Sequence, residues 1–263
     1  MTSAKKDYST SPKPDQTRKN LDLEIAPLVK WTLIPENLPE IDGYEVAAIH
    51  LRAGGASTEY YDWWRLDDTR TVFAMMTCSG SSFASSMLLT YMSGVAAATV
   101  PHGEDLGQTL SRMNQAFAHY HSSTNWLGTA LIMCVDAHKH KLLVASAGHR
   151  WPLLRDGAGE VRPLDDLLPG LPFGLEEHVA YEAASIPLSE GDCVVAYTDG
   201  VVEAMNAQKE FYGVDRLRRL IESPASSVSD IVTKVQQDLR EFTGDSTIRD
   251  DATVLAIGRG SAI

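Results

Sequence analysis

The order in which strand-like and helix-like segments follow one another is the feature that most limits how this chain can fold. In chain order these are strands at 44–51, 59–64 and 71–78, helices at 83–100 and 106–120, strands at 127–135, 141–147, 151–154 and 193–197, helices at 214–221 and 228–242, and a strand at 252–257. Strands and helices come in separate runs, which is typical of layered α+β domains and not of alternating βαβ units. The pattern therefore predicts an α+β fold.

The two helices of the first half are predicted on different grounds. Residues 83–100 form the longest apolar stretch, but Ser85, Thr90 and Gly94 interrupt it, so it is too polar and too short to span a bilayer comfortably. We expect this stretch to form a helix buried within the fold. Residues 106–120 have amphipathic spacing, and Asp105 is placed to cap that helix.

Size and charge narrow the class of protein. The chain has 263 residues, which suits one large domain or two small ones, and an apolar fraction of 44%, which is that of a globular protein. Its net charge of −12 argues against nucleic acid or an anionic membrane as the main partner. Residues 1–20 have almost no apolar side chains, so we expect a disordered tail there.

The cysteines bear on the compartment in which the protein works. Cys78, Cys134 and Cys193 all lie in apolar runs, and no short spacing relates them. An odd number of cysteines without a disulfide framework indicates reduced, buried thiols and a cytoplasmic protein. The first residues are polar and show no signal peptide, which agrees with that location.

Two acidic clusters at strand ends suggest a metal site. Asp199-Gly200 follows the apolar strand at 193–197, and Asp250-Asp251 precedes the last strand. Carboxylates that meet at one sheet edge could hold a hard divalent cation, because such cations prefer oxygen ligands. The alternative is that each cluster is an ordinary turn, since Asp-Gly pairs are common in turns.

Further motifs occur in a fixed order along the chain. These are Glu59-Tyr60-Tyr61-Asp62, Ala147-Gly148-His149-Arg150, Leu171-Pro172-Phe173-Gly174, Tyr197-Thr198-Asp199-Gly200 and Asp250-Asp251-Ala252-Thr253. Together with an entry segment at 34–47, the ordered set resembles the metal-dependent PPM (PP2C-like) protein phosphatases, in the bacterial subgroup of sporulation stage II E and sigma-factor-regulator phosphatases. The likeness covers roughly residues 21–258.

The resemblance implies a fold and a chemistry. The fold is a four-layer α-β-β-α sandwich of two antiparallel sheets flanked by helices, here as one domain over 21–263 after the tail. Carboxylates at one sheet edge hold two Mn²⁺ or Mg²⁺ ions, and a water or hydroxide between them attacks a phosphoserine or phosphothreonine. The implied substrate is a phosphoprotein, and an anti-sigma-factor antagonist is one candidate. The resemblance leaves the oligomeric state open.

The same resemblance places the site on particular residues. Glu59, Asp199, Gly200 and Asp250 fall on metal-binding positions, with Asp199 and Asp250 as catalytic residues. Glu59 stands where the family usually has aspartate, and Thr77 stands where it has the aspartate that bridges the two metals. Three nearby acids are candidate outer-shell or substitute ligands, namely Asp62, Glu203 and Asp251.

Three interpretations of this altered site stay open. The protein is a working phosphatase with a rearranged site, in which Glu59 or Asp62 fills in for the lost ligand; or it holds one metal and has weak activity; or it is a pseudophosphatase. In the last case it is a non-catalytic binding module in a partner-switching circuit. The intact motifs at Asp199 and Asp250 favour metal chemistry, whereas Thr77 favours its loss. We favour the phosphatase.

Other candidate residues have plainer explanations. Arg52, at the end of a strand, could clamp a phosphate through its fork of donors, but a surface arginine explains it as well. His149 could contact phosphate or a partner, but a structural hydrogen bond in a sheet corner is the plainer explanation. His138 and His140 are expected to lie in a solvated hairpin turn, because further metal ligands are missing nearby.

Overall fold

A computed structural model describes most of the chain. The described residues are 33–53, 58–80, 83–102, 105–121, 126–165, 170–244 and 250–260. The predicted disordered tail at 1–20 and residues 21–32 of the predicted domain lie outside the described residues.

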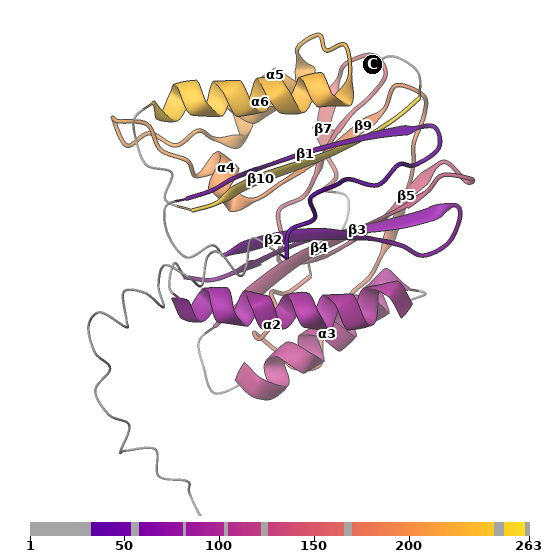
Figure 1. The fold of residues 1–263 in the computed structure, drawn as a ribbon, viewed down its shortest axis with the longest axis vertical. Coiled ribbons are helices and arrows are strands. Elements are labelled where there is room, and N and C mark those ends of the chain that lie inside the picture. The colour runs from indigo at the N-terminus through magenta and orange to yellow at the C-terminus, as the bar shows by residue number, and fades with distance from the viewer. Residues whose placement is uncertain are drawn as a thin grey trace, which may run out of the picture.

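Within the described residues, ten strands form two five-stranded sheets, and every pair of neighbouring strands is antiparallel. Figure 1 shows the two sheets facing each other. The first sheet has the order β1-β10-β9-β6-β7, with bounds Tyr44–Leu51, Ala252–Arg259, Cys193–Tyr197, Leu153–Arg155 and Val161–Pro163. The second has the order β2-β3-β4-β5-β8, with bounds Glu59–Arg65, Arg70–Cys78, Gly128–Asp136, Lys141–Ala147 and Ala184–Pro187.

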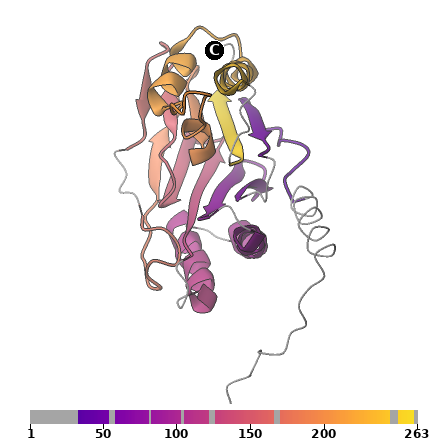
Figure 2. The same ribbon diagram turned by 90° about the vertical axis from the view of Figure 1, so that its left-hand side faces the viewer.

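Helices cover the outer face of each sheet. α5 (Val214–Glu222) and α6 (Val228–Thr243) lie on the first sheet, and α2 (Phe83–Thr99) and α3 (Leu106–His121) lie on the second. Figure 2 shows the two sheets between these helix pairs. A 3-10 turn, η1 (Val100–His102), follows α2. The predicted α+β fold with four α-β-β-α layers is confirmed.

The apolar residues of the sandwich separate into three cores. One lies between the first sheet and its helices and contains Val195, Leu217 and Val235. A second lies between the other sheet and its helices and contains Leu110 and Phe117. The third lies between the two sheets. Central strands are therefore buried on both faces, which explains why β9 and β10 are almost continuously apolar in sequence.

The expectation that residues 83–100 form a buried helix is only half right. The segment is helical, but α2 lies on the outside of the sandwich, and the side chain of Met87 is 59% exposed. Its polar and small residues allow one side to face water while Leu89 and Met92 enter the core. The predicted cap of α3 is confirmed, since Asp105 Oδ1 accepts a hydrogen bond from the backbone N–H of Gln108.

Several short elements escaped prediction, η1 among them. β7 and β8 are three and four residues long, and α4 (Asp199–Val202) has a single turn. Segments this short contain too few residues to show a period. Among the residues that the structure describes, no helix combines the length and the apolar character needed to cross a membrane.

Candidate active site

Ends of strands from both sheets meet at one edge of the sandwich and form a cleft. Its volume is about 490 Å³. Its described lining consists of Thr58, Glu59, Thr77, Cys78, Ser79, Gly80, Leu127, Thr129, Pro172, Asp199, Gly200, Glu203 and Asp250. Four of these are carboxylates, and the described lining contains no Lys, Arg or His. Glu59, Asp199 and Asp250, which lie far apart in sequence, therefore come together as the sequence predicted.

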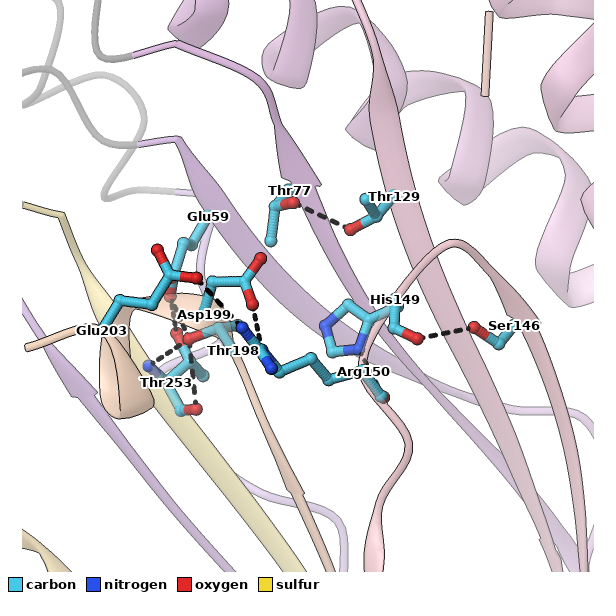
Figure 3. A network of polar contacts seen from close by, with 10 residues as sticks. All are labelled: Glu59, Thr77, Thr129, Ser146, His149, Arg150, Thr198, Asp199, Glu203 and Thr253. Atoms are coloured by element: carbon cyan, nitrogen blue, oxygen red, sulfur yellow. Dashed lines mark hydrogen bonds and ion pairs between the residues drawn. The ribbon is translucent and has the colours of Figure 1, made fainter. Parts of the chain in front are cut away.

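Glu59 connects the two sheets. It begins β2 in the second sheet, and its side chain is buried, with the residue 2% exposed. Its Oε2 accepts hydrogen bonds of 2.8 Å from the hydroxyls of Thr198 and Thr253, which belong to the edge of the first sheet (Figure 3). Burial raises the pKa of Glu59 to about 8, with a small addition from the charge of Asp251, although these hydrogen bonds oppose the shift.

Gly200 is required where α4 begins. A Cβ at this position would lie 1.8 Å from the backbone oxygen of Asp251 and 2.9 Å from Glu59 Oε1. The backbone after Asp199 can therefore approach the start of β10 only because residue 200 has no side chain. This close approach holds the two late acidic motifs together. Gly200 is therefore needed for packing against Asp251, which is more than the turn-forming role of a common Asp-Gly pair.

Thr77 lies beside Glu59 in the second sheet. The two residues are direct partners in the antiparallel ladder of β2 and β3, and Thr77 is also the partner of Thr129 on β4. The hydroxyls of Thr77 and Thr129 are 2.8 Å apart and hydrogen-bonded. The position that resembles a bridging metal ligand therefore carries a neutral hydroxyl that already has a protein partner.

Arg150 is a site residue that the sequence analysis did not single out. Its Nε donates to Asp199 Oδ1, and its Nη2 donates to Glu203 Oε1 at 3.0 Å (Figure 3). Partial burial works against the charged form of Arg150, but the charge and hydrogen bond of Asp199, together with smaller contributions from Tyr197 and Glu203, outweigh it, so the pKa of Arg150 is raised. The signal available in the sequence was the position of this basic residue, directly after Ala147-Gly148-His149.

Two of the candidate outer-shell acids lie outside the cleft lining. Asp62 is three residues after Glu59, so it points to the opposite face of β2, where it accepts hydrogen bonds from Tyr60 and Trp63. Asp251 is 1% exposed and accepts a hydrogen bond of 2.7 Å from the backbone N–H of Ala53. Glu203, the third candidate, does line the cleft.

The remaining candidates have mainly structural surroundings. His149 is buried, its Nδ1 is 3.0 Å from the backbone oxygen of Arg150, and burial lowers its pKa. This contact agrees with the expected structural hydrogen bond. His138 and His140 lie in the turn between β4 and β5, as predicted. Arg52 is exposed and does not belong to the described cleft lining.

A comparison with protein families covers most of the chain. The family described as Stage II sporulation protein E (SpoIIE) matches residues 67–260. The chain belongs to the SpoIIE family. SpoIIE proteins are PP2C-like serine phosphatases, and phosphatases of this kind depend on Mg²⁺ or Mn²⁺. The family predicted from the ordered motifs is thereby confirmed.

Individual relatives and solved structures resemble the chain over most of its length. The chain is 23% identical to the phosphoserine phosphatase RsbU of Bacillus subtilis, over 90% of this chain and 70% of RsbU. It is 22% identical to Protein IcfG of Synechocystis, over 91% of this chain but only 42% of IcfG, so it spans less than half of that relative. Among solved structures, the SiaA-PP2C domain of Pseudomonas aeruginosa shares the fold, with a TM-score of 0.76, 17% identity, and coverage of 93% of this chain and 98% of that domain.

By residue type, though not by their present arrangement, the donors of the cleft suit one hard divalent cation better than the bridged pair of the family. Glu59, Asp199 and Asp250 supply carboxylate oxygens, which suit Mg²⁺ or Mn²⁺. Thr77 cannot supply the anionic bridge between two dications. Within the described parts of the chain, no three His, Cys, Asp or Glu side chains converge as a metal site. In this arrangement Asp199 and Glu203 are held by Arg150.

Proposed function

We propose that the protein is a metal-dependent serine/threonine phosphatase with an altered metal site, and that it hydrolyses phosphoserine or phosphothreonine on a regulatory protein. The observation that carries this proposal is the charge of the cleft. Four acidic residues line it, and the single positive charge of Arg150, which pairs with Asp199 and Glu203, does not balance them. A phosphoryl dianion would be repelled there unless a cation were bound, so binding of phosphate and binding of a divalent cation go together.

The chain's own residues have distinct roles in this proposal. Asp199 and Asp250 are exposed and line the cleft, so they are free of the burial that constrains Glu59. Glu59 contributes a carboxylate that is fixed by Thr198 and Thr253, and Gly200 keeps Asp199 close to it. When bound, the cation supplies charge neutralisation at the phosphoryl group and a water of lowered pKa.

The family and the position of the cleft at the rim of the sheets support a proposal for the substrate class. RsbU is a phosphoserine phosphatase, and the cleft here lies at a sheet edge formed by strand ends and loops. We propose a phosphorylated regulatory protein of a partner-switching circuit, of the anti-sigma-factor-antagonist type, as the substrate. The net charge of −12 agrees with a protein partner and not with nucleic acid.

A second candidate is a pseudophosphatase that binds a phosphoprotein without hydrolysing it. The observation that favours it is the hydrogen bond between Thr77 and Thr129, which replaces an expected metal bridge by a neutral contact within the sheet. A bridge lost in this way removes a negative charge that two dications would need. The fold and the cleft would then survive as a binding surface.

Hydrolysis of a phosphoserine peptide distinguishes the two candidates. The full chain is assayed for released phosphate with Mn²⁺ and with EDTA. A phosphatase releases phosphate only with the metal, and Asp199→Asn abolishes the release. Asp215→Asn is the matched control, because Asp215 is exposed in the first turn of α5 and belongs to no part of the cleft lining. Peptide binding without any phosphate release at high Mn²⁺ would establish the pseudophosphatase.

A further inference from the structure

Arg150 is the feature of the cleft that the proposed function leaves unexplained. It follows His149 in the loop after β5, and its guanidinium reaches across to α4 and its C-terminal end. There it pairs with Asp199, which the proposed function uses as a metal ligand, and with Glu203, which lines the same cleft. One cationic side chain therefore engages two of the four cleft carboxylates.

These contacts engage one oxygen of each of two carboxylate groups that face the same cleft as the proposed metal. A divalent cation that uses Asp199 needs a carboxylate oxygen that faces the cleft, whereas Oδ1 of Asp199 here accepts from Arg150. The positive charge of Arg150 and that of a cation bound to the same carboxylate also repel each other. Full engagement of Asp199 by Arg150 and by a metal ion is therefore unfavourable.

Thr77 and Arg150 act in the same direction on the charge of the site. Thr77 is neutral where the family resemblance expects an aspartate, so one negative charge is missing. Arg150 adds one positive charge beside Asp199 and Glu203. Both residues make the cleft less negative, so it can neutralise less positive charge from bound metal ions. This is the pattern expected if a guanidinium supplies positive charge that a second metal ion would otherwise supply.

We propose that Arg150 is a built-in counter-ion of the metal site, which holds Asp199 and Glu203 while the metal is absent and is displaced when a divalent cation binds. This inference rests on the proposed function, because it assumes that Asp199 binds the cation. It makes Arg150 a positioning residue that sets the cation affinity of the cleft. The side chain of Arg150 is 39% exposed, so it has room to swing into solvent.

Calorimetric titration of Mn²⁺ into the wild type and Arg150→Ala tests the proposal without any measurement of activity. Removal of a competing ion pair at an exposed site is expected to tighten Mn²⁺ binding by about threefold to tenfold. Arg150→Lys, which keeps the charge but loses the forked geometry, is expected to lie between the two. Thermal melting in EDTA confirms that each variant is folded.

Arg218→Ala is the matched control. Arg218 also makes an exposed ion pair, with Glu222 on α5, and it belongs to no part of the cleft lining. Its loss removes the same charge elsewhere and should leave Mn²⁺ affinity within twofold of the wild type. A second readout is the NMR signal of the Arg150 Nε–H group, identified by its absence from Arg150→Ala, which should shift during a Mg²⁺ titration as the ion pair opens.

The outcomes separate this inference from the proposed function. If Arg150→Ala and the wild type bind Mn²⁺ equally, or if Arg218→Ala tightens binding as much, the counter-ion role is wrong and the phosphatase proposal stands. If none of these proteins binds Mn²⁺, both proposals are wrong. Tighter binding in Arg150→Ala alone, together with a shifted Arg150 signal, supports the inference even if no phosphopeptide is hydrolysed.

Discussion

Glu59 and Thr77 lie directly opposite each other in the ladder of β2 and β3, and both line the cleft. Above about pH 8, where Glu59 is ionised, Thr77→Asp would place two carboxylates face to face. The metal-free variant is then expected to melt at a lower temperature than the wild type, because like charges directly opposite each other destabilise a sheet. In the presence of Mn²⁺ the order should reverse, since the new carboxylate restores an anionic ligand. Thermal melting with EDTA and with Mn²⁺ measures both effects.

Thr77→Asn is the control for this substitution. It has nearly the shape of aspartate but no charge, and it also breaks the hydrogen bond to Thr129. It should lose stability in both conditions, by about 1 kcal/mol for the lost hydrogen bond, and should gain nothing from Mn²⁺ beyond the wild type. Equal Mn²⁺ responses of the Asp and Asn variants would show that residue 77 does not face the metal.

The buried carboxyl of Glu59 predicts how stability depends on pH in the metal-free protein. Burial raises its pKa from 4.5 to about 8, so the folded state binds this proton more tightly than the unfolded chain does. Stability from this group is complete below about pH 4.5 and is lost as the pH rises towards about 8. Urea unfolding in EDTA at pH 5 and pH 8 should show a larger loss for the wild type than for Glu59→Gln. An identical pH dependence of the two proteins would rule out this assignment.

Asp250 and Asp251 are neighbours in sequence, but we predict that their substitution affects different properties, cation binding for Asp250 and stability for Asp251. Asp251 is buried and holds the backbone of Ala53, so Asp251→Ala should lower the free energy of unfolding by about 1–3 kcal/mol. Asp250 is exposed in the cleft, so Asp250→Ala should leave stability almost unchanged and weaken Mn²⁺ binding. Urea unfolding and calorimetry of both variants check the pair, and a large loss of stability in Asp250→Ala would contradict it.

Gly200→Ala is expected to destabilise the protein and to weaken cation binding. Its new Cβ would lie 1.8 Å from the backbone oxygen of Asp251, so the start of α4 must move away from β10. Overpacking of this kind typically costs about 1–3 kcal/mol. Gly94→Ala is the control with the opposite sign, because a Cβ at Gly94 in α2 meets nothing within 4 Å. It should stabilise the helix by about 0.5–1 kcal/mol. Urea unfolding of both variants measures the contrast.

The sequence was sufficient for most of the fold because long, strongly patterned segments carry their own signal. β1, β5 and β9 have the predicted bounds. The ordered motifs identified the family and the four-layer arrangement. The elements that were missed are those in which tertiary pairing, and not local pattern, decides the structure. β8 pairs along the edge of β5, and α4 is a single turn fixed by the contact between Gly200 and Asp251.

The candidate site was predicted in part, for a related reason. The sequence motifs indicate which residues lie near the cleft. Those that line it are Glu59, Thr77, Asp199, Gly200, Glu203 and Asp250. The motifs do not show which face of a strand a residue takes or what it contacts. Asp62 lies on the other face of β2, and Asp251 braces Ala53. Arg150 could not be assigned, because its partners are 49 and 53 residues further along the chain.

The link from Glu59 to Thr198 and Thr253 has a consequence for folding. Each sheet has its own helix pair and its own outer core, so either half could begin to collapse alone. Neither half contains all the acidic residues of the cleft, because Glu59 belongs to the second sheet, whereas Asp199 and Asp250 lie beside strands of the first. The complete site therefore exists only when both halves are docked, so the appearance of cation affinity during refolding would report when docking occurs.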